Sequence, residues 1–269
     1  MPDVTIGDVR LAYDVFGEGE PVLLVCGTGQ VALTWQVYQV PALVGAGYRV
    51  VTFDNRGIGL SEAPPAPYSV KQMAEDAAGL IEKLDLGPCR VAGLSLGAMI
   101  TQELALAHPD LVRSAVMMGT VGRGDVFRRA VVESWVERAE ADVEMPRLAE
   151  AVDVAFQLYS PFMLNDDERM QTYLDFALAA PRWENPGRLG QFTADRDYGE
   201  RLDELAGIRV PSMVIGFELD VLTPAHMSRE VADAIPECQY LEIERCGHAG
   251  PFEKPDEVNR ALLAFFAEN

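Results

Sequence analysis

The pentapeptide Gly93-Leu94-Ser95-Leu96-Gly97 constrains the fold of this chain more than any other feature. The apolar-leaning run 89–92 before it predicts a short buried strand, and the unbroken run 98–107 after it has helical spacing. A serine between a strand and a helix, flanked by glycines, is typical of a tight turn that presents the hydroxyl at the end of a sheet. Larger flanking side chains would clash there, and the N-terminus of the helix favours developing negative charge. We therefore predict that Ser95 is a nucleophile and not part of a plain glycine-rich turn.

Short apolar, β-branched runs recur along the chain with helical segments between them, which predicts an α/β fold with a mostly parallel sheet. Central strands are expected at 22–25, 50–53, 91–94, 115–118 and 213–216, with a further strand at 240–243. Alternation of polar and apolar residues over 10–16 predicts an antiparallel edge strand. Helices are expected at 35–46, 70–85, 97–108, 224–234 and 255–267.

The stretch 121–190 breaks this alternation, because it contains no convincing strand and has helical character. We expect it to form a helical cap over the carboxyl edge of the sheet, with 1–120 and 191–269 forming the core. Helices are predicted at 126–140, 145–159 and 166–179. Most of its aromatic residues are expected to pack the cap against the core, and a few to line the roof of a ligand pocket. The pocket candidates from the cap are Trp135, Phe156 and Tyr159.

Composition narrows the class of protein. A length of 269 residues allows one large domain, or one domain with an insertion. A formal charge of −20 argues against binding to nucleic acids or anionic membranes, which favour basic patches. No leader pattern opens the sequence, and no apolar run reaches the roughly 18 residues of a membrane span. Four cysteines without a CxxC pair predict free thiols in a reducing compartment, hence a cytoplasmic protein.

A serine hydroxyl needs a base to take its proton, and the chain has three histidines. His108 ends the helix behind Ser95, on the order of 10 Å or more away at roughly 1.5 Å of rise per residue. His226 falls in the expected first turn of a helix, and His248 lies in a glycine-rich loop directly after strand 240–243. Because the loops at strand C-termini gather the chemistry of such sheets, we predict His248 as the base and keep His226 as the competitor.

The third member of a triad orients the imidazole and stabilises its charged form. Asp220 follows the strand at 213–217 and precedes a helix, while Glu218, two residues earlier, competes for the role. With Asp220 chosen, the chain order is nucleophile, acid, base, which differs from the orders in chymotrypsin and subtilisin.

An oxyanion needs backbone N–H donors close to the nucleophile. We expect one from Leu96, the residue after Ser95, and one from Thr28 in the glycine-rich loop after strand 22–25. Trp35 follows this loop closely enough to flank an acyl pocket, although packing in the core explains it equally well.

The chain resembles the α/β-hydrolase superfamily along almost its whole length, and four separated motifs carry the resemblance. They are Cys26-Gly27-Thr28-Gly29, Asp54-Asn55-Arg56-Gly57-Ile58-Gly59-Leu60-Ser61, the Ser95 pentapeptide, and Gly247-His248 with the trailing Glu253-Lys254-Pro255. The resemblance implies a mostly parallel eight-stranded sheet flanked by helices with one inserted helical cap, and a structural role for Asp54 and Arg56. The family usually has histidine where Cys26 stands. Because the expected donor is a backbone amide, oxyanion binding should survive, while Cys26 either alters the polarity of the pocket or is a reactive thiol.

The overall likeness is to the single-cap branch, which includes esterases, lactonases, thioesterases, carbon–carbon bond hydrolases, haloperoxidase-like perhydrolases and tailoring methyl esterases. Ser95 argues against the epoxide hydrolase and dehalogenase members, which use an aspartate nucleophile. We expect a serine hydrolase that cleaves an ester, lactone or thioester bond of a small to medium apolar substrate through an acyl-enzyme.

The alternatives on the same fold are a perhydrolase, a carbon–carbon bond hydrolase, a lyase or cyclase of natural-product biosynthesis, and a non-catalytic ligand receptor. No metal or organic cofactor is expected, since the sequence has neither metal-ligand spacing nor a dinucleotide fingerprint. The expected partner is a small molecule. Small relatives with one cap occur as monomers and as dimers, so a homodimer is the other partner considered.

Overall fold

The computed structural model describes all 269 residues of the chain. Its eight strands form one sheet in the order β1-β2-β4-β3-β5-β6-β7-β8, and the neighbours from β4 across to β8 run parallel. The strands are β1 Asp3–Ile6, β2 Val9–Phe16, β3 Glu20–Val25, β4 Tyr48–Phe53, β5 Cys89–Leu94, β6 Val112–Met118, β7 Ser212–Phe217 and β8 Gln239–Ile243. The predicted α/β class with a mostly parallel, eight-stranded sheet is confirmed.

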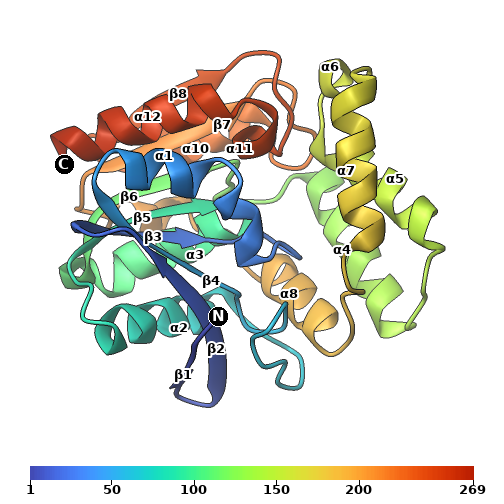
Figure 1. The fold of residues 1–269 in the computed structure, drawn as a ribbon, viewed down its shortest axis with the longest axis horizontal. Helices are drawn as coiled ribbons and strands as arrows, with labels where there is room; N and C mark the ends of the chain where they lie inside the picture. Colours follow the sequence, from blue (N-terminus) through green and yellow to red (C-terminus); the bar gives the residue numbers. More distant parts are fainter.

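Helices cover both faces of this sheet (Figure 1). Successive strand residues point to opposite faces. Val91 joins the core beneath α2, α3 and α10, and Ala92 joins the core beneath α1 and α12. These helices are α1 Gln39–Gly45, α2 Val70–Lys83, α3 Leu96–Ala107, α10 Ala225–Ala234 and α12 Pro255–Glu268. Short helical turns add η1 Ala32–Gln36, η2 Pro109–Leu111, α9 Leu202–Leu205 and α11 Gly250–Glu253. No helix is both long and apolar enough to cross a membrane.

Two local predictions differ from the structure. The antiparallel strand predicted at 10–16 is β2, but it is not the edge of the sheet, because β1 pairs along its outer side. β1 escaped prediction because its four residues are mostly exposed and too few to show alternation. The helix predicted over 35–46 is divided into η1 and α1. Pro41 explains the break, since proline fits only the first turn of a helix, and α1 accordingly begins at Gln39.

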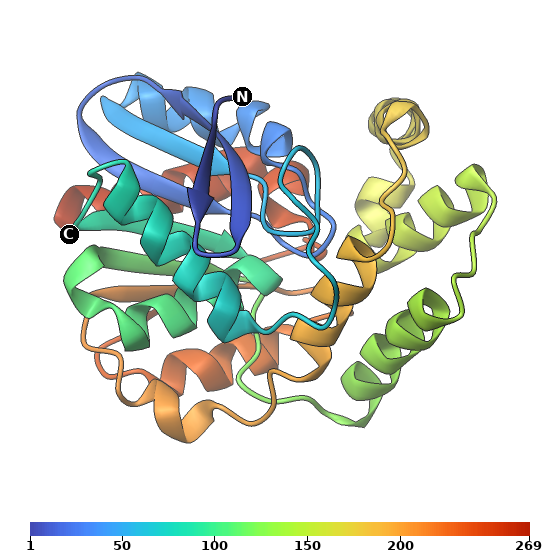
Figure 2. The same ribbon diagram turned by 90° about the horizontal axis from the view of Figure 1, so that it is seen from below.

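Between β6 and β7 the chain forms helices and no strand. We call α4–α7 the insert; Figures 1 and 2 show it standing apart from the layered sheet and helices. Its helices are α4 Val126–Glu140, α5 Arg147–Leu158, α6 Pro161–Leu164 and α7 Asp167–Ala179. The predicted boundary at residue 190 falls within α8, Gly187–Arg196, which packs on α4 and on Gly57 of the core. The division into core and cap stays a prediction.

A buried ion pair holds the loop that supports α8. The Arg56 guanidinium contacts the Asp76 carboxylate through two hydrogen bonds of 2.6 and 2.7 Å, and both side chains are buried. Arg56 also reaches Asp8 at 3.2 Å, but the Asp8 side chain is 68% exposed. The main-chain oxygen of Arg56 accepts a hydrogen bond from Gln191 of α8. The Arg56–Asp76 pair therefore fixes the loop at Arg56, which α8 contacts through Gln191.

Asp76→Ala should lower the free energy of unfolding by about 3 kcal/mol or more, because it leaves a buried guanidinium without its main partner. Asp8→Ala removes only an exposed carboxylate and should cost less than about 1 kcal/mol. Urea denaturation of both variants and the wild type measures the difference. Equal losses in the two variants would contradict the assignment of the buried pair.

Candidate active site

The turn at Ser95 is the sharp strand-to-helix turn that the sequence predicts. β5 ends at Leu94 and α3 begins at Leu96, and Ser95 between them has φ 56° and ψ −119°. A Cβ at Gly93 would lie 2.1 Å from the carbonyl oxygen of Gly97, so the first glycine cannot carry a side chain. A Cβ at Gly97 would lie 2.3 Å from the carbonyl oxygen of Val25 at the end of β3. The second glycine thus lets β3 end directly beside the serine.

His248 and Asp220 form a buried pair. The Nδ1 atom of His248 lies 2.6 Å from Oδ2 of Asp220, and the two residues follow the adjacent strands β8 and β7. Thr223 donates its hydroxyl to Oδ2 of Asp220 at 2.7 Å, and the N–H groups of Leu222 and Thr223 donate to Oδ1 at 2.8 Å each. The carboxylate is therefore held by four donors.

Burial alone would raise the pKa of Asp220, but His248 and the hydrogen bonds from Thr223 outweigh burial and lower this pKa below its usual value. The carboxylate is thus kept ionised, which favours the imidazole tautomer that carries its proton on Nδ1. The Nε2 atom of His248 is then left as the hydrogen-bond acceptor and proton acceptor of the ring.

Ser95 and His248 both lie next to the main chain at the end of β6. The N–H of Ser95 donates to the carbonyl oxygen of Met118 at 2.9 Å. The next residue, Gly119, has φ 53°, and a Cβ there would lie 3.3 Å from the Nδ1 and Cε1 atoms of His248. The main chain at Gly119 therefore contacts the imidazole on one side and adjoins Ser95 on the other. The Ser95 hydroxyl itself forms no hydrogen bond within the protein.

The other two histidines lie elsewhere. His226 is exposed in the first turn of α10, and His108 pairs with the carboxylate of Glu75 at 2.8 Å. Glu218, the competitor of Asp220, is exposed and accepts the main-chain N–H of Arg245 at 2.6 Å. No three His, Cys, Asp or Glu side chains gather so as to hold a metal ion. Of the acids and bases weighed from the sequence, the structure pairs Asp220 with His248, and His248 contacts Gly119 next to the residue that bonds Ser95.

The loop after β3 lies against the serine and leaves the N–H of Thr28 unused. A Cβ at Gly27 would be 3.3 Å from the Cβ of Ser95. The N–H of Gly27 is taken by Gln30 at 2.8 Å and that of Gly29 by Gln191 at 3.0 Å, whereas the N–H of Thr28 has no acceptor within the protein. Leu96, at the start of α3, has an N–H without an intrahelical partner. The N–H of Thr28 is therefore unused within the protein, and that of Leu96 has no partner within α3.

Cys26 does not have the character of a reactive thiol. Its side chain is fully buried, and burial first, with the charge of Asp54 second, raises its pKa well above the usual value. Since the thiolate is the reactive form, this environment suppresses nucleophilic chemistry. The thiol packs near the carbonyl oxygen of Phe53, and the main-chain oxygen of Cys26 accepts a hydrogen bond from Asn55 at 2.8 Å. Burial therefore argues against the reactive-thiol alternative, and Cys26 supports the loop from within the core.

A cavity of about 550 Å³ lies where α4 and α5 of the insert face the loop that carries Asp220. Its wall is largely apolar and includes the predicted pocket residue Trp135, which also packs on Phe192 with ring centroids 5.5 Å apart. The lining residues are Phe127, Val131, Ser134, Trp135, Arg138, Asp153, Gln157, Val221 and Leu222. Leu222 joins this cavity to the acid, because its N–H donates to Asp220.

The remaining three pocket predictions are placed outside that cavity. Trp35 is wholly buried in the core beneath α1 and α12 and stacks on Phe252, so its role is packing. Phe156 is 66% exposed, because it lies on the solvent side of α5. Tyr159 packs edge-to-face against Tyr173 at 5.1 Å, within the insert. Spacing along a helix could not distinguish these positions, since each depends on which face meets the core.

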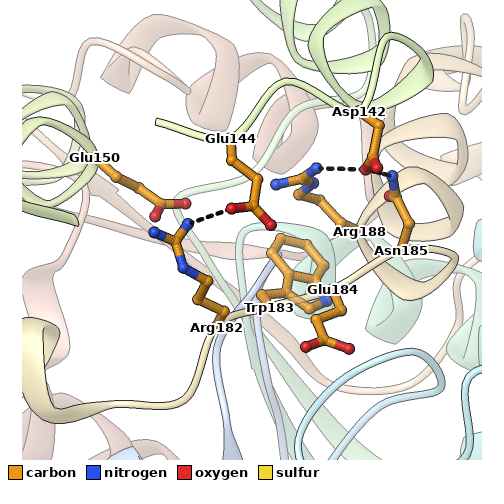
Figure 3. Close-up of a pocket in the computed structure, with 8 residues that line it drawn as sticks. All are labelled: Asp142, Glu144, Glu150, Arg182, Trp183, Glu184, Asn185 and Arg188. Atoms are coloured by element: carbon orange, nitrogen blue, oxygen red, sulfur yellow. Dashed lines mark hydrogen bonds and ion pairs between the residues drawn. The ribbon is translucent and has the colours of Figure 1, made fainter. Parts of the chain in front are cut away.

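A second cavity, of about 210 Å³, has a mostly polar wall that includes neither Ser95 nor His248 (Figure 3). Its wall is formed by Asp142, Glu144, Glu150, Arg182, Trp183, Glu184, Asn185 and Arg188. Trp183 connects it to the site, because a Cβ at Gly29 would lie 2.8 Å from the indole ring. The indole N–H donates to the carbonyl oxygen of Gly57 at 2.8 Å. Trp183 therefore covers the loop that carries Thr28.

Sequence reasoning missed Thr223, Trp183 and Gln191 as parts of this site. Thr223 could have been found, because a hydroxyl three residues after a loop aspartate often bonds back to it. Gln191 and Trp183 reach the loop after β3 from more than 150 residues away, and no local pattern signals such contacts.

The chain belongs to the α/β-hydrolase family, since the alpha/beta hydrolase fold family matches residues 20–255. A Mycobacterium tuberculosis (strain ATCC 25618 / H37Rv) protein named "Putative non-heme bromoperoxidase BpoC" is 42% identical over 96% of this chain and 98% of its own. The crystal structure of BpoC from M. tuberculosis H37Rv gives a TM-score of 0.91 and covers 96% of both chains.

Two further proteins that this chain resembles are named for other reactions. "Putative carbamate hydrolase RutD" of Azorhizobium caulinodans is 30% identical over 100% of this chain and 99% of its own. The enol-lactonase of Burkholderia xenovorans LB400 is 26% identical, with a TM-score of 0.86 over 99% of this chain and 100% of that one. Together with family membership, these likenesses identify an α/β hydrolase enzyme.

Thr223→Val should lower the free energy of unfolding at pH 7 by about 1–3 kcal/mol, because the ionised Asp220 loses a buried donor. Asp220 has a lowered pKa in the folded protein, so its contribution is complete above the unfolded pKa of about 4 and is lost as the pH falls through the folded value. The deficit of the variant should therefore shrink in acid. Thr223→Ser keeps the hydroxyl and should stay within about 1 kcal/mol of wild type. Urea denaturation from pH 7 to pH 3 measures both, and a pH-independent deficit would contradict the explanation.

Proposed function

We propose that this protein is a serine hydrolase that cleaves an ester, lactone or thioester bond through an acyl-enzyme. The observation that carries the proposal is the buried Asp220–His248 pair, 2.6 Å apart, at strand ends next to Ser95. The unused N–H of Thr28 beside the serine adds a site for developing negative charge. A binding protein would not require this combination of strained serine, oriented base and unused donors.

In the proposed reaction, Ser95 Oγ attacks the carbonyl carbon while Nε2 of His248 takes the hydroxyl proton. Asp220 holds Nδ1–H and stabilises the imidazolium that forms. The N–H groups of Thr28 and Leu96 bind the oxyanion of the tetrahedral intermediate. His248 then returns the proton to the leaving group, so that an alcohol or thiol departs and the acyl group stays on Ser95. Water, deprotonated by His248, repeats these steps and releases the acid.

The apolar cavity between the insert and the acid loop supports the apolar character of the proposed substrate. Its aromatic and aliphatic wall suits an apolar group of small to medium size, since ligand sites are mostly apolar clefts with a few polar groups. The names of the enol-lactonase and the carbamate hydrolase support the proposal, because both describe cleavage at a carbonyl carbon. Apolar esters, lactones and thioesters are therefore the substrates that we propose to test.

Ser95→Ala and His248→Ala should each lower kcat/KM toward a p-nitrophenyl ester by about 10⁴–10⁶, because the triad acts as a unit. His226→Ala, at an exposed histidine, should retain activity within about twofold. Intact mass after treatment with a small fluorophosphonate should show one adduct in wild type and none in Ser95→Ala. Turnover by Ser95→Ala near the wild-type rate would sink the mechanism.

Perhydrolysis is the second candidate, and the 42% identical relative with the bromoperoxidase name favours it. Hydrogen peroxide would replace water in the second half of the reaction. Its terminal oxygen would attack the acyl carbon, the bond to Ser95 would break, and a peracid would leave with its O–O bond intact. The peracid would then oxidise bromide to hypobromite in solution, by a two-electron transfer outside the protein.

Incubation of the enzyme with ethyl acetate, hydrogen peroxide and bromide distinguishes the two reactions. Perhydrolysis predicts bromination of monochlorodimedone that requires the ester and is lost in Ser95→Ala. Release of acetate by the wild type without any bromination would leave hydrolysis as the reaction and exclude perhydrolysis of this ester.

A further inference from the structure

Glu253 is a buried carboxylate that neither the triad nor any ion pair uses. It ends the short helix α11, five residues after His248, and is 4% exposed. Its Oε2 atom accepts the N–H of Gly247 at 3.0 Å and the N–H of Ser160 at 3.1 Å. Its Oε1 atom accepts the hydroxyl of Ser160. A buried charge that is held only by these three donors must depend on their geometry.

The donors come from two different parts of the chain. Gly247 belongs to the histidine loop, residues 244–249, whereas Ser160 lies between α5 and α6 of the insert, as the N-cap of α6. One carboxylate therefore joins the insert to the residue directly before the proposed base. A second link lies on the other side of the base, where the N–H of Ala249 donates to the carbonyl oxygen of Leu158 at 2.9 Å.

The main chains at this contact touch directly. A Cβ at Gly247 would lie 2.6 Å from the nitrogen of Ser160 and 2.7 Å from the carbonyl oxygen of Leu158. Arg169 of α7 adds hydrogen bonds to the main-chain oxygens of Phe252 and Glu253, at 3.1 and 2.9 Å. The histidine loop is thus fixed by the insert before and after His248, and not by its own strand alone.

We propose that Glu253 is a positioning residue for His248 and that it makes the end of α5 part of the catalytic arrangement. The inference rests on the proposed serine-hydrolase function and extends it to a residue that does not touch the substrate. Placement of a base within a fraction of an ångström strongly affects rate, since a 1 Å error can cost about 100-fold. The hydrogen bond between Glu253 and the N–H of Gly247 restrains the main chain next to His248 and so limits errors in the placement of the imidazole.

Glu253→Gln is the direct test, because its amide would turn an NH₂ group toward donors that now meet a carboxylate oxygen. We expect kcat to fall about 10- to 100-fold, with KM within about threefold, and the rate of fluorophosphonate labelling to fall in parallel. Glu257→Gln changes an exposed glutamate of α12 and is the control. It should leave kcat, KM and the labelling rate within about twofold of wild type. Every variant is measured well below its own midpoint of thermal unfolding.

Ser160 supplies the second half of the test. Ser160→Ala should lower kcat less than Glu253→Gln does, and Ser160→Thr, which keeps the hydroxyl, should restore it. The double variant Ser160→Ala with Glu253→Gln should be no slower than Glu253→Gln alone, because both changes break one unit. Hydrogen exchange of the peptide that contains Ala249 should accelerate in Glu253→Gln.

The outcomes separate the two proposals. Wild-type kcat in Glu253→Gln, or effects of the two substitutions that simply add, would overturn the positioning role. An unchanged rate of hydrogen exchange at Ala249 in Glu253→Gln would overturn the coupling between insert and loop. This measurement does not depend on enzyme activity. Wild-type protein that forms no fluorophosphonate adduct and turns over no ester would instead overturn the serine-hydrolase function, and the role of Glu253 in catalysis with it.

Discussion

Main-chain carbonyl groups press against both glycines of the Ser95 turn. The carbonyl of Gly97 lies where a side chain on Gly93 would stand, and the carbonyl of Val25 lies where a side chain on Gly97 would stand. The end of β3 is thereby forced beside the serine, and the loop after β3 follows with its unused N–H at Thr28. The left-handed conformation of Ser95 costs about 1–3 kcal/mol. The packing of the buried strand and helix on either side offsets this strain. Close packing at one turn thus builds two parts of the site at once.

The rest of the site depends on a parallel sheet whose strand ends lie side by side. Ser95, Gly119, Asp220 and His248 each follow one of four neighbouring strands, β5 to β8. Burial there would neutralise a lone carboxylate, and the four donors around Asp220 keep it charged. The same fold therefore supplies both the low-dielectric environment that strengthens the His248–Asp220 interaction and the donors that make a buried charge tolerable.

Much of this arrangement could be predicted from the sequence, because its signals are local. Glycine spacing marks the turn, apolar runs mark the central strands, and Asp220 and His248 each follow such a run, which placed them in loops at strand ends. The structure supports choosing Asp220 over Glu218, since Glu218 is exposed and bonds Arg245. What the sequence could not supply depends on contacts between distant segments. Trp183 over Gly29 and the burial of Trp35 in the core are decided only by how finished elements pack.

The insert contributes to two different parts of the structure, the wall of the apolar cavity and the contact with the histidine loop. Its α4 and α5 line the apolar cavity, where changes of side chain would alter which molecules fit. The end of α5 also meets the histidine loop, where Gly247 leaves no room for a side chain and Leu158 and Ser160 bond through their main chains. Main-chain contacts tolerate changes of side chain far better than side-chain contacts do, so the cavity can vary while the contact persists. Glu253 differs from these contacts, because its bonds to Gly247 and Ser160 need a side-chain carboxylate, and the proposed coupling between insert and base is therefore most sensitive to substitution at that residue.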